Sequence, residues 1–124
     1  MRAASSPTTL VLGASAKPDR YSNRAIRHLL AYGHAVVALG KSGDDVAGVV
    51  IQKAWPEAMV IDTITIYLNR SNQTAWEDRI IANEPRRVIF NPGAENPELA
   101  DRLRAAGAVV ENACTLVMLA THQY

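Results

Sequence analysis

A loop of small, polar and basic residues follows the first apolar run of the sequence, residues 8–12. Gly13 permits a tight turn off a strand, and the small side chains of Ala14 and Ser15 would let a phosphate approach the backbone. The loop leads into a segment with helical spacing, and the free N–H groups at a helix N-terminus attract anions. It also contains two full positive charges and several polar groups, from Lys17, Arg20, Tyr21, Ser22 and Asn23. These features favour a phosphate-binding loop over the alternative of a structural turn with solvated basic residues.

The residues after the second apolar run, 35–39, indicate which nucleotide such a loop would bind. A site for NAD places an acidic residue there to hold the ribose 2′-hydroxyl, whereas this sequence has Gly40 and Lys41. The three-glycine dinucleotide fingerprint is also absent, because Ser15 and Pro18 follow Gly13. A lysine suits a ribose phosphate, as in NADP or the 3′-phosphate of coenzyme A (CoA). The alternative is a solvated lysine in a turn.

Another polar loop, residues 91–95, follows the apolar run 87–90. Asn91 could donate a hydrogen bond to a ligand oxygen or bond its own turn, and Gly93 permits a positive φ. The alternative is that this loop only shapes the entry into a helix. The sequence suggests no catalytic group and no metal ligands, because His28, His34 and His122 lack ligand spacing and Cys114 has no neighbouring base. We therefore expect Cys114 to be a buried, inert thiol.

Short apolar runs alternate with segments of helical spacing along the chain. Continuous apolar runs are typical of strands buried on both faces, as in a parallel sheet. We predict strands at residues 8–12, 35–39, 64–68, 87–90 and 108–110, with a peripheral strand at 49–51. The sequence therefore predicts an α/β fold, a three-layer Rossmann-like domain with a five- or six-stranded, mainly parallel sheet.

Capping residues locate the helices between these strands. Ser22 could cap the first helix, and Ser71 or Asn72 the second. Asn96, with a proline at the first helical position, opens a third helix. The last segment, 114–124, would be a short helix or an irregular tail. The carboxyl ends of the strands meet at one edge of the sheet, so the three loops described above would face one cleft.

Length and composition limit the remaining possibilities. The chain has 124 residues, 48% hydrophobic and 20% charged, with a net charge of +1 and one cysteine. This composition argues against a disordered chain, a DNA-coating protein and a membrane-spanning protein, since apolar runs are far shorter than the ~20 residues needed. A single cysteine fits a reducing compartment. We predict one soluble, cytoplasmic domain over residues 1–124, too small to hold a separate substrate domain.

The order of these motifs resembles the small CoA-binding (CoA-binding domain type 2) family. Its members are single Rossmann-like domains similar to the nucleotide-binding part of succinyl-CoA synthetase α subunits. The resemblance covers the chain from Thr8 to Tyr124. Its most distinctive strings are Arg-Val-Ile-Phe-Asn-Pro-Gly-Ala-Glu-Asn at 87–96 and Cys-Thr-Leu-Val-Met-Leu at 114–119, with Leu-Val-Leu-Gly-Ala-Ser at 10–15 and Tyr-Ser-Asn at 21–23 near the start.

The resemblance implies that CoA lies across the carboxyl edge of the sheet. Its pyrophosphate would contact residues 13–15, Ser22 and Asn23, and Lys41 would meet the 3′-phosphate. The loop at Asn69 and the loop that contains Asn91, Pro92, Gly93 and Ala94 would flank the pantetheine arm. Better known relatives often have Asn-Pro after the second strand where this chain has Gly40 and Lys41, so the placement of the adenine stays open.

Three functions are compatible with this sequence. The first is a non-catalytic protein that binds CoA or acyl-CoA. The second is an enzyme component that uses NADP or acyl-CoA and is completed by a partner chain. The third is a ligand-free interaction module, for example a homodimer formed through Trp55, Trp76 and the apolar C-terminal segment. Nucleic acid is not an expected partner, because the tryptophans are not interleaved with basic residues at stacking intervals.

Overall fold

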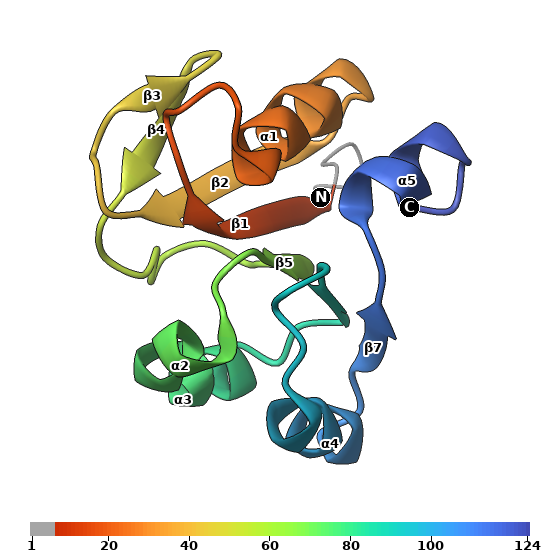
Figure 1. Cartoon of the computed structure of the whole chain (residues 1–124). Coiled ribbons are helices and arrows are strands. Elements are labelled where there is room, and N and C mark those ends of the chain that lie inside the picture. The colour runs from red at the N-terminus through yellow and green to blue at the C-terminus, as the bar shows by residue number, and fades with distance from the viewer. Residues whose placement is uncertain (1–6) are drawn as a thin grey trace, which may run out of the picture.

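The computed structural model describes residues 7–124 and has a central sheet of seven strands (Figure 1). The strand order is β3-β4-β2-β1-β5-β6-β7, and every pairing is parallel except that of β3 with β4. The strands are β1 (Thr8–Ala14), β2 (Ala35–Gly40), β3 (Asp45–Val46), β4 (Val49–Gln52), β5 (Thr63–Ile66), β6 (Arg87–Phe90) and β7 (Val109–Asn112). The predicted α/β Rossmann-like class is confirmed.

The sheet has one strand more than the five or six predicted. The additional strand, β3, has two residues and forms a hairpin with β4, in which Val46 pairs with Val49. Ala47 and Gly48 between them have φ values of 50° and 89°, as expected for a two-residue turn that matches the twist of a hairpin. Two residues are too short to appear as an apolar run, so the pattern of the sequence does not reveal β3.

Helices cover both faces of the sheet, which gives three layers (Figure 1). One face packs against α1 and α5, through residues such as Ile26 and Leu119. The other packs against α3 and α4, through residues such as Ile80 and Leu103. The helices are α1 (Tyr21–Ala31), α2 (Arg70–Gln73), a 3-10 turn η1 (Thr74–Trp76), α3 (Glu77–Ala82), α4 (Pro97–Ala105) and α5 (Thr115–Ala120). All residues of β5 and β6 are buried, as expected for central strands of a parallel sheet covered on both faces.

The caps of two helices differ from those predicted. α1 begins two residues earlier, with Arg20 at the N-cap and no side-chain cap, while Ser22 is buried inside the first turn. Asn69 caps α2, where its side-chain oxygen accepts a hydrogen bond from the Asn72 N–H at 3.0 Å. The cap of α4 is as predicted, since Asn96 accepts from the Leu99 N–H at 3.2 Å.

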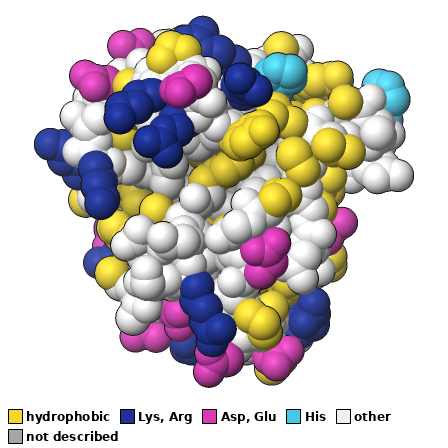
Figure 2. Space-filling model, viewed as in Figure 1, with side chains coloured by type: hydrophobic (Ala, Val, Ile, Leu, Met, Phe, Trp, Pro, Cys, Tyr) yellow, Lys and Arg dark blue, Asp and Glu magenta, His cyan; other side chains and the backbone are white. Residues whose placement is uncertain are grey.

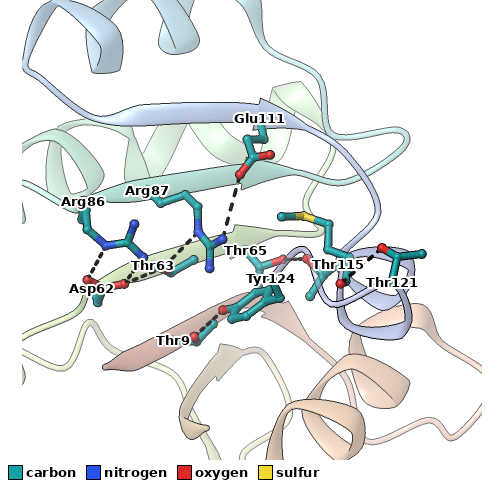
Figure 3. Close-up of polar contacts among 11 residues, drawn as sticks. Thr9, Asp62, Thr63, Thr65, Arg86, Arg87, Glu111, Thr115, Thr121 and Tyr124 are labelled. Carbon is teal, nitrogen blue, oxygen red and sulfur yellow. Dashed lines mark hydrogen bonds and ion pairs between the residues drawn. The ribbon is translucent and has the colours of Figure 1, made fainter. Parts of the chain in front are cut away.

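The amino ends of the strands form an edge closed by polar contacts (Figure 3). The ring of Tyr124 lies below the guanidinium of Arg87, with 4.2 Å from Cζ to the ring centroid, and its hydroxyl is hydrogen-bonded to Thr9. Asp62 accepts two hydrogen bonds of 2.9 Å from Arg86, and these lower the pKa of its carboxyl. These contacts fix the end of the described chain against β1 and β6.

Trp55 and Trp76 pack against each other, with ring centroids 6.2 Å apart. Trp55 is 8% exposed and belongs to the core, and Trp76 is partly buried against the same core. The hypothesis that both tryptophans form a dimer surface is therefore wrong for Trp55, because its ring is already covered within the domain.

Candidate functional site

The strand order places a topological switch point between β1 and β5. The chain leaves β1 towards β2 on one side and leaves β5 towards β6 on the other. In open parallel sheets, ligands bind beyond the carboxyl ends of the strands at such a point. The loops after β1, β2, β5 and β6 all lie at this edge, as the sequence predicts.

Two glycines let the strand ends approach one another at this edge. Gly13 has φ +93°, and a Cβ there would lie 3.1 Å from the backbone nitrogen of Leu68. A Cβ on Gly40 would lie 2.3 Å from the carbonyl oxygen of Ala14, a distance that no pair of such atoms tolerates. Gly40 is therefore required by the close packing of β1 against β2. Gly13 lies within β1, at the point where the register with β2 shifts, so the loop begins after Ala14 and not at Gly13 as predicted.

The loop after β1 is held from behind by Asn23. This buried side chain donates a hydrogen bond to the carbonyl of Ser15 at 3.0 Å and accepts one from Nε of Arg27 at 3.0 Å. The hydroxyl of Ser15 accepts from the backbone N–H of Lys17 at 3.1 Å. Asn23 and Ser22 are thus placed to shape the loop, while Lys17 and Arg20 are exposed on it.

The start of α1 has the properties of an anion site. No side chain caps it and its first turn contains no acidic residue. The first N–H groups of a helix have no partner within the helix, and the helix dipole makes this end partly positive. Since Arg20 is the N-cap, its side chain adds a full charge at the same point.

A cavity of about 430 Å³ lies at the ends of β1, β2 and β5, and we call it the lysine cavity. It contains two positive charges and an apolar wall, and is lined by Leu12, Gly13, Leu39, Gly40, Lys41, Lys53, Leu68, Asn72, Ala75 and Trp76. Figure 2 shows Lys and Arg side chains gathered on the side of the molecule where α1, β2 and β4 lie.

Lys53 also lines this cavity, although no motif predicts it. β4 runs parallel to β2 with Gln52 paired to Leu39, so Lys53 follows directly beside Gly40 and Lys41. The peripheral strand at 49–51 was predicted, and the residues after it had to reach the same edge of a parallel sheet. The predicted strand at 49–51, taken as parallel to the strand at 35–39, places Lys53 at the carboxyl edge of the sheet.

A second cavity, of about 400 Å³, lies on the α1–α5 side of this edge, and we call it the α5 cavity. It is mainly apolar and is lined by Tyr21, Tyr67, Asn91, Pro92, Cys114, Leu116 and Val117. Burial raises the pKa of Tyr67 to about 12, against a smaller opposing effect of the Thr115 and Thr65 hydroxyls. No hydrogen bond of ordinary geometry reaches the Tyr67 hydroxyl from residues 7–124. Cys114 is half-buried in this cavity, so the prediction of a buried thiol is wrong.

Asn91 binds within the protein through all of its side-chain groups. Its amide nitrogen donates to Oγ1 of Thr65 at 2.7 Å and to the carbonyl of Ile66 at 3.0 Å, and its oxygen accepts from the Thr115 N–H at 2.9 Å. Both amide hydrogens are therefore in use, which removes the predicted donation to a ligand in this conformation. Asn91 instead positions the wall of the α5 cavity.

The other predicted residues of the carboxyl edge differ in exposure. Pro92 and Gly93 are exposed, and Gly93 has the expected positive φ, +93°. Ala94 is buried, with its carbonyl accepting from Gln73 at 2.7 Å. Asn69 is exposed but its side-chain oxygen is occupied by the cap of α2. Tyr21 is 64% exposed and borders the α5 cavity.

Comparisons with known proteins agree with this fold. The family model described as a CoA binding domain matches residues 7–120. No curated protein matches the chain. Within residues 7–124, no helix is long and apolar enough to cross a bilayer.

Solved structures share the fold over most of the chain. One, described as the crystal structure of an uncharacterized protein, is 37% identical, with a TM-score of 0.92, and the match covers 97% of this chain and 99% of that one. A hypothetical protein from Pyrococcus horikoshii OT3 is 21% identical (TM-score 0.78, 88% and 78% covered). A dinucleotide-forming acetyl-coenzyme A synthetase from Ca. Korarchaeum cryptofilum, in complex with phosphate and ADP, is 20% identical (TM-score 0.70, 88% and 26% covered). Since the family model spans nearly the whole described chain, this protein belongs to the CoA binding domain family.

Proposed function

We propose that this protein binds coenzyme A or an acyl-CoA across the carboxyl edge of its sheet, without catalysis of its own. The observation that carries the proposal is the uncapped start of α1, which follows the loop after β1 and carries Arg20. The pyrophosphate would lie there, because orphan N–H groups and a positive dipole end favour a doubly charged anion. Membership of the CoA binding domain family supports the choice of nucleotide.

The 3′-phosphate would lie in the lysine cavity. Lys41 and Lys53 both line it, and neither forms an ion pair among the described residues. Two free ammonium groups from adjacent strand ends suit a phosphate better than a hydroxyl. Leu39 and Trp76 provide an apolar wall on which an adenine would pack.

A binding role is favoured over catalysis by the chemistry of the edge. No histidine and no carboxylate lines either the lysine cavity or the α5 cavity in the part of the chain that the structure describes. Those walls therefore lack the side chains that most often act as general acid or base, histidine and the carboxylates. We also propose a cytoplasmic location, because a single cysteine fits a reducing compartment.

The test is isothermal titration of CoA, dephospho-CoA and NADP into the protein. We expect CoA to bind at micromolar concentrations and NADP to bind more weakly. Lys41→Ala and Lys53→Ala should each weaken the binding of CoA about tenfold, which corresponds to one charge-assisted hydrogen bond. The affinity for dephospho-CoA should stay nearly unchanged. Arg104→Ala on α4, whose side chain pairs with Asp101, is the control and should change neither affinity.

Three results would contradict the proposal in different ways. No heat with CoA at near-millimolar concentrations would refute CoA binding. Tighter binding of NADP than of CoA would make NADP the ligand. Equal losses for CoA and dephospho-CoA in the lysine variants would remove these side chains from the 3′-phosphate.

A further inference from the structure

The α5 cavity differs from the lysine cavity in charge. None of its seven lining residues is Lys, Arg, Asp, Glu or His, although it opens at the same edge of the sheet. Val117 is 57% exposed at its border, and Figure 2 shows a band of hydrophobic side chains between α1 and α5. Its volume of about 400 Å³ lies in the ~300–1,000 Å³ range of small-molecule sites. The size and chemistry therefore suit an uncharged, apolar group.

One residue joins this cavity to the proposed phosphate site. Tyr21 is the first residue of α1, where the pyrophosphate would lie, and its side chain lines the α5 cavity. The lysine cavity includes Gly13 and the end of β2, on the other side of β1 from β6. A ligand with its ribose phosphate among the lysines and its pyrophosphate at α1 would thus have its remaining arm directed towards β6 and the α5 cavity.

Buried hydrogen bonds hold one side of the α5 cavity, the wall at Asn91. Asn91 ties the end of β6 to β5 and to the first residue of α5, Thr115. The hydroxyls of Thr65 and Thr115 are themselves 2.8 Å apart and fully buried. A preformed apolar cavity avoids the free-energy cost of ordering its walls on binding.

We propose that the α5 cavity holds the acyl chain of a CoA thioester, so that the protein prefers acyl-CoA with an apolar chain to free CoA. This inference rests on the proposed function and names the ligand class for the same site. Each methylene group transferred from water into such a cavity tightens binding by up to about fourfold. A chain that ends in a carboxylate gains nothing, because no positive group lines the cavity to pair with it.

Isothermal titration with CoA, acetyl-CoA, hexanoyl-CoA and malonyl-CoA tests this inference. Hexanoyl-CoA has four methylenes more than acetyl-CoA, and we expect it to bind at least tenfold more tightly. Malonyl-CoA should bind no more tightly than acetyl-CoA. Equal affinities for the hexanoyl and acetyl thioesters would overturn the inference while leaving the proposed function intact, whereas no binding of any of the four would refute the proposed function itself.

Two matched valine variants test whether the acyl chain binds in the α5 cavity. Val117→Asp puts a charge at the border of the α5 cavity, and Val109→Asp puts the same charge on β7, where Val109 is 52% exposed and lines neither cavity. V117D should reduce the ratio of hexanoyl-CoA to acetyl-CoA affinity to about one. V109D should leave the ratio at its original value, and thermal unfolding should show that both variants fold.

Two outcomes of the variant experiment would overturn the inference. If V117D keeps the hexanoyl preference, the acyl chain binds elsewhere. If light scattering shows a dimer that V117D converts to a monomer, with no acyl preference in the original protein, the apolar band is covered by a second copy of the chain instead of a ligand.

Discussion

The side chain of Asn91 is the point at which β5, β6 and α5 meet. It forms three hydrogen bonds of 2.7–3.0 Å, with Thr65, Ile66 and Thr115, and all four residues are buried. An alanine would leave the Thr115 N–H and the Ile66 carbonyl without this partner in a place that water does not reach. Each buried group left unpaired costs about 1–3 kcal/mol.

We expect Asn91→Ala to lower the free energy of unfolding by about 3 kcal/mol, measured by urea denaturation. Asn112→Ala is the matched control, because Asn112 ends the neighbouring strand β7 with its side chain exposed, and should cost less than about 0.5 kcal/mol. Similar losses in the two variants would mean that the hydrogen bonds of Asn91 add little to the stability of the domain.

At the scale of elements, the binding edge depends on the short distance between the carboxyl ends of β1 and β2. The register between them shifts between Leu12 and Ala14, and Gly40 pairs with Ala14 after this shift. A Cβ on Gly40 would meet the Ala14 carbonyl oxygen at 2.3 Å, so any side chain separates the two strands. This separation would move the ends of β1 and β2 apart, and both strand ends line the lysine cavity.

Gly40→Ala should therefore destabilise the domain by about 2 kcal/mol, as overpacking does, and also weaken CoA binding. Gly107→Ala is the comparison: Gly107 has φ +94° with open space around its Cβ, so alanine there costs about 1 kcal/mol of backbone strain and leaves CoA affinity unchanged. Urea denaturation and calorimetry of the two variants check both readouts. If the folded G40A protein binds CoA with unchanged affinity, the close packing of β1 and β2 at Gly40 is not needed for CoA binding.

At the scale of the whole molecule, a net charge of +1 conceals an uneven distribution. Exposed lysines and arginines gather near α1, β2 and β4, while arginines elsewhere are paired, for example Arg86 with Asp62 and Arg102 with Glu77. The free positive charges therefore face the edge at which we propose that an anionic nucleotide binds.

This distribution predicts a strong salt dependence for CoA. Between 0.1 M and 1 M NaCl the Debye length falls from about 10 Å to about 3 Å, and we expect the Kd for CoA to rise by roughly tenfold. The ratio of hexanoyl-CoA to acetyl-CoA affinity should not fall, because it depends on apolar burial. A Kd for CoA that is independent of salt would contradict an electrostatic role for the lysines.

Much of the fold could be predicted from the sequence because it depends on local patterns. Apolar runs, glycines and the Asn96-Pro97 cap are readable along the chain, and they predicted the parallel sheet and its helices, whereas the loop after the first strand begins past Ala14 and not at Gly13. The Rossmann-like class and the family followed from the same strings, and both are confirmed.

The roles of individual polar residues were decided only by the tertiary structure. Asn91, Asn23 and Asn69 have the same chemistry as ligand-binding residues, but Asn91 and Asn23 bond other segments of the protein and Asn69 caps its own helix. Lys53 and Val117 join the edge through strand pairing and helix packing, which bring together residues that are far apart in sequence. A hydrogen-bonding group is satisfied by whichever partner lies within about 3 Å. The sequence therefore determines which groups are present, and the packing of the elements determines which of them remain free for a ligand.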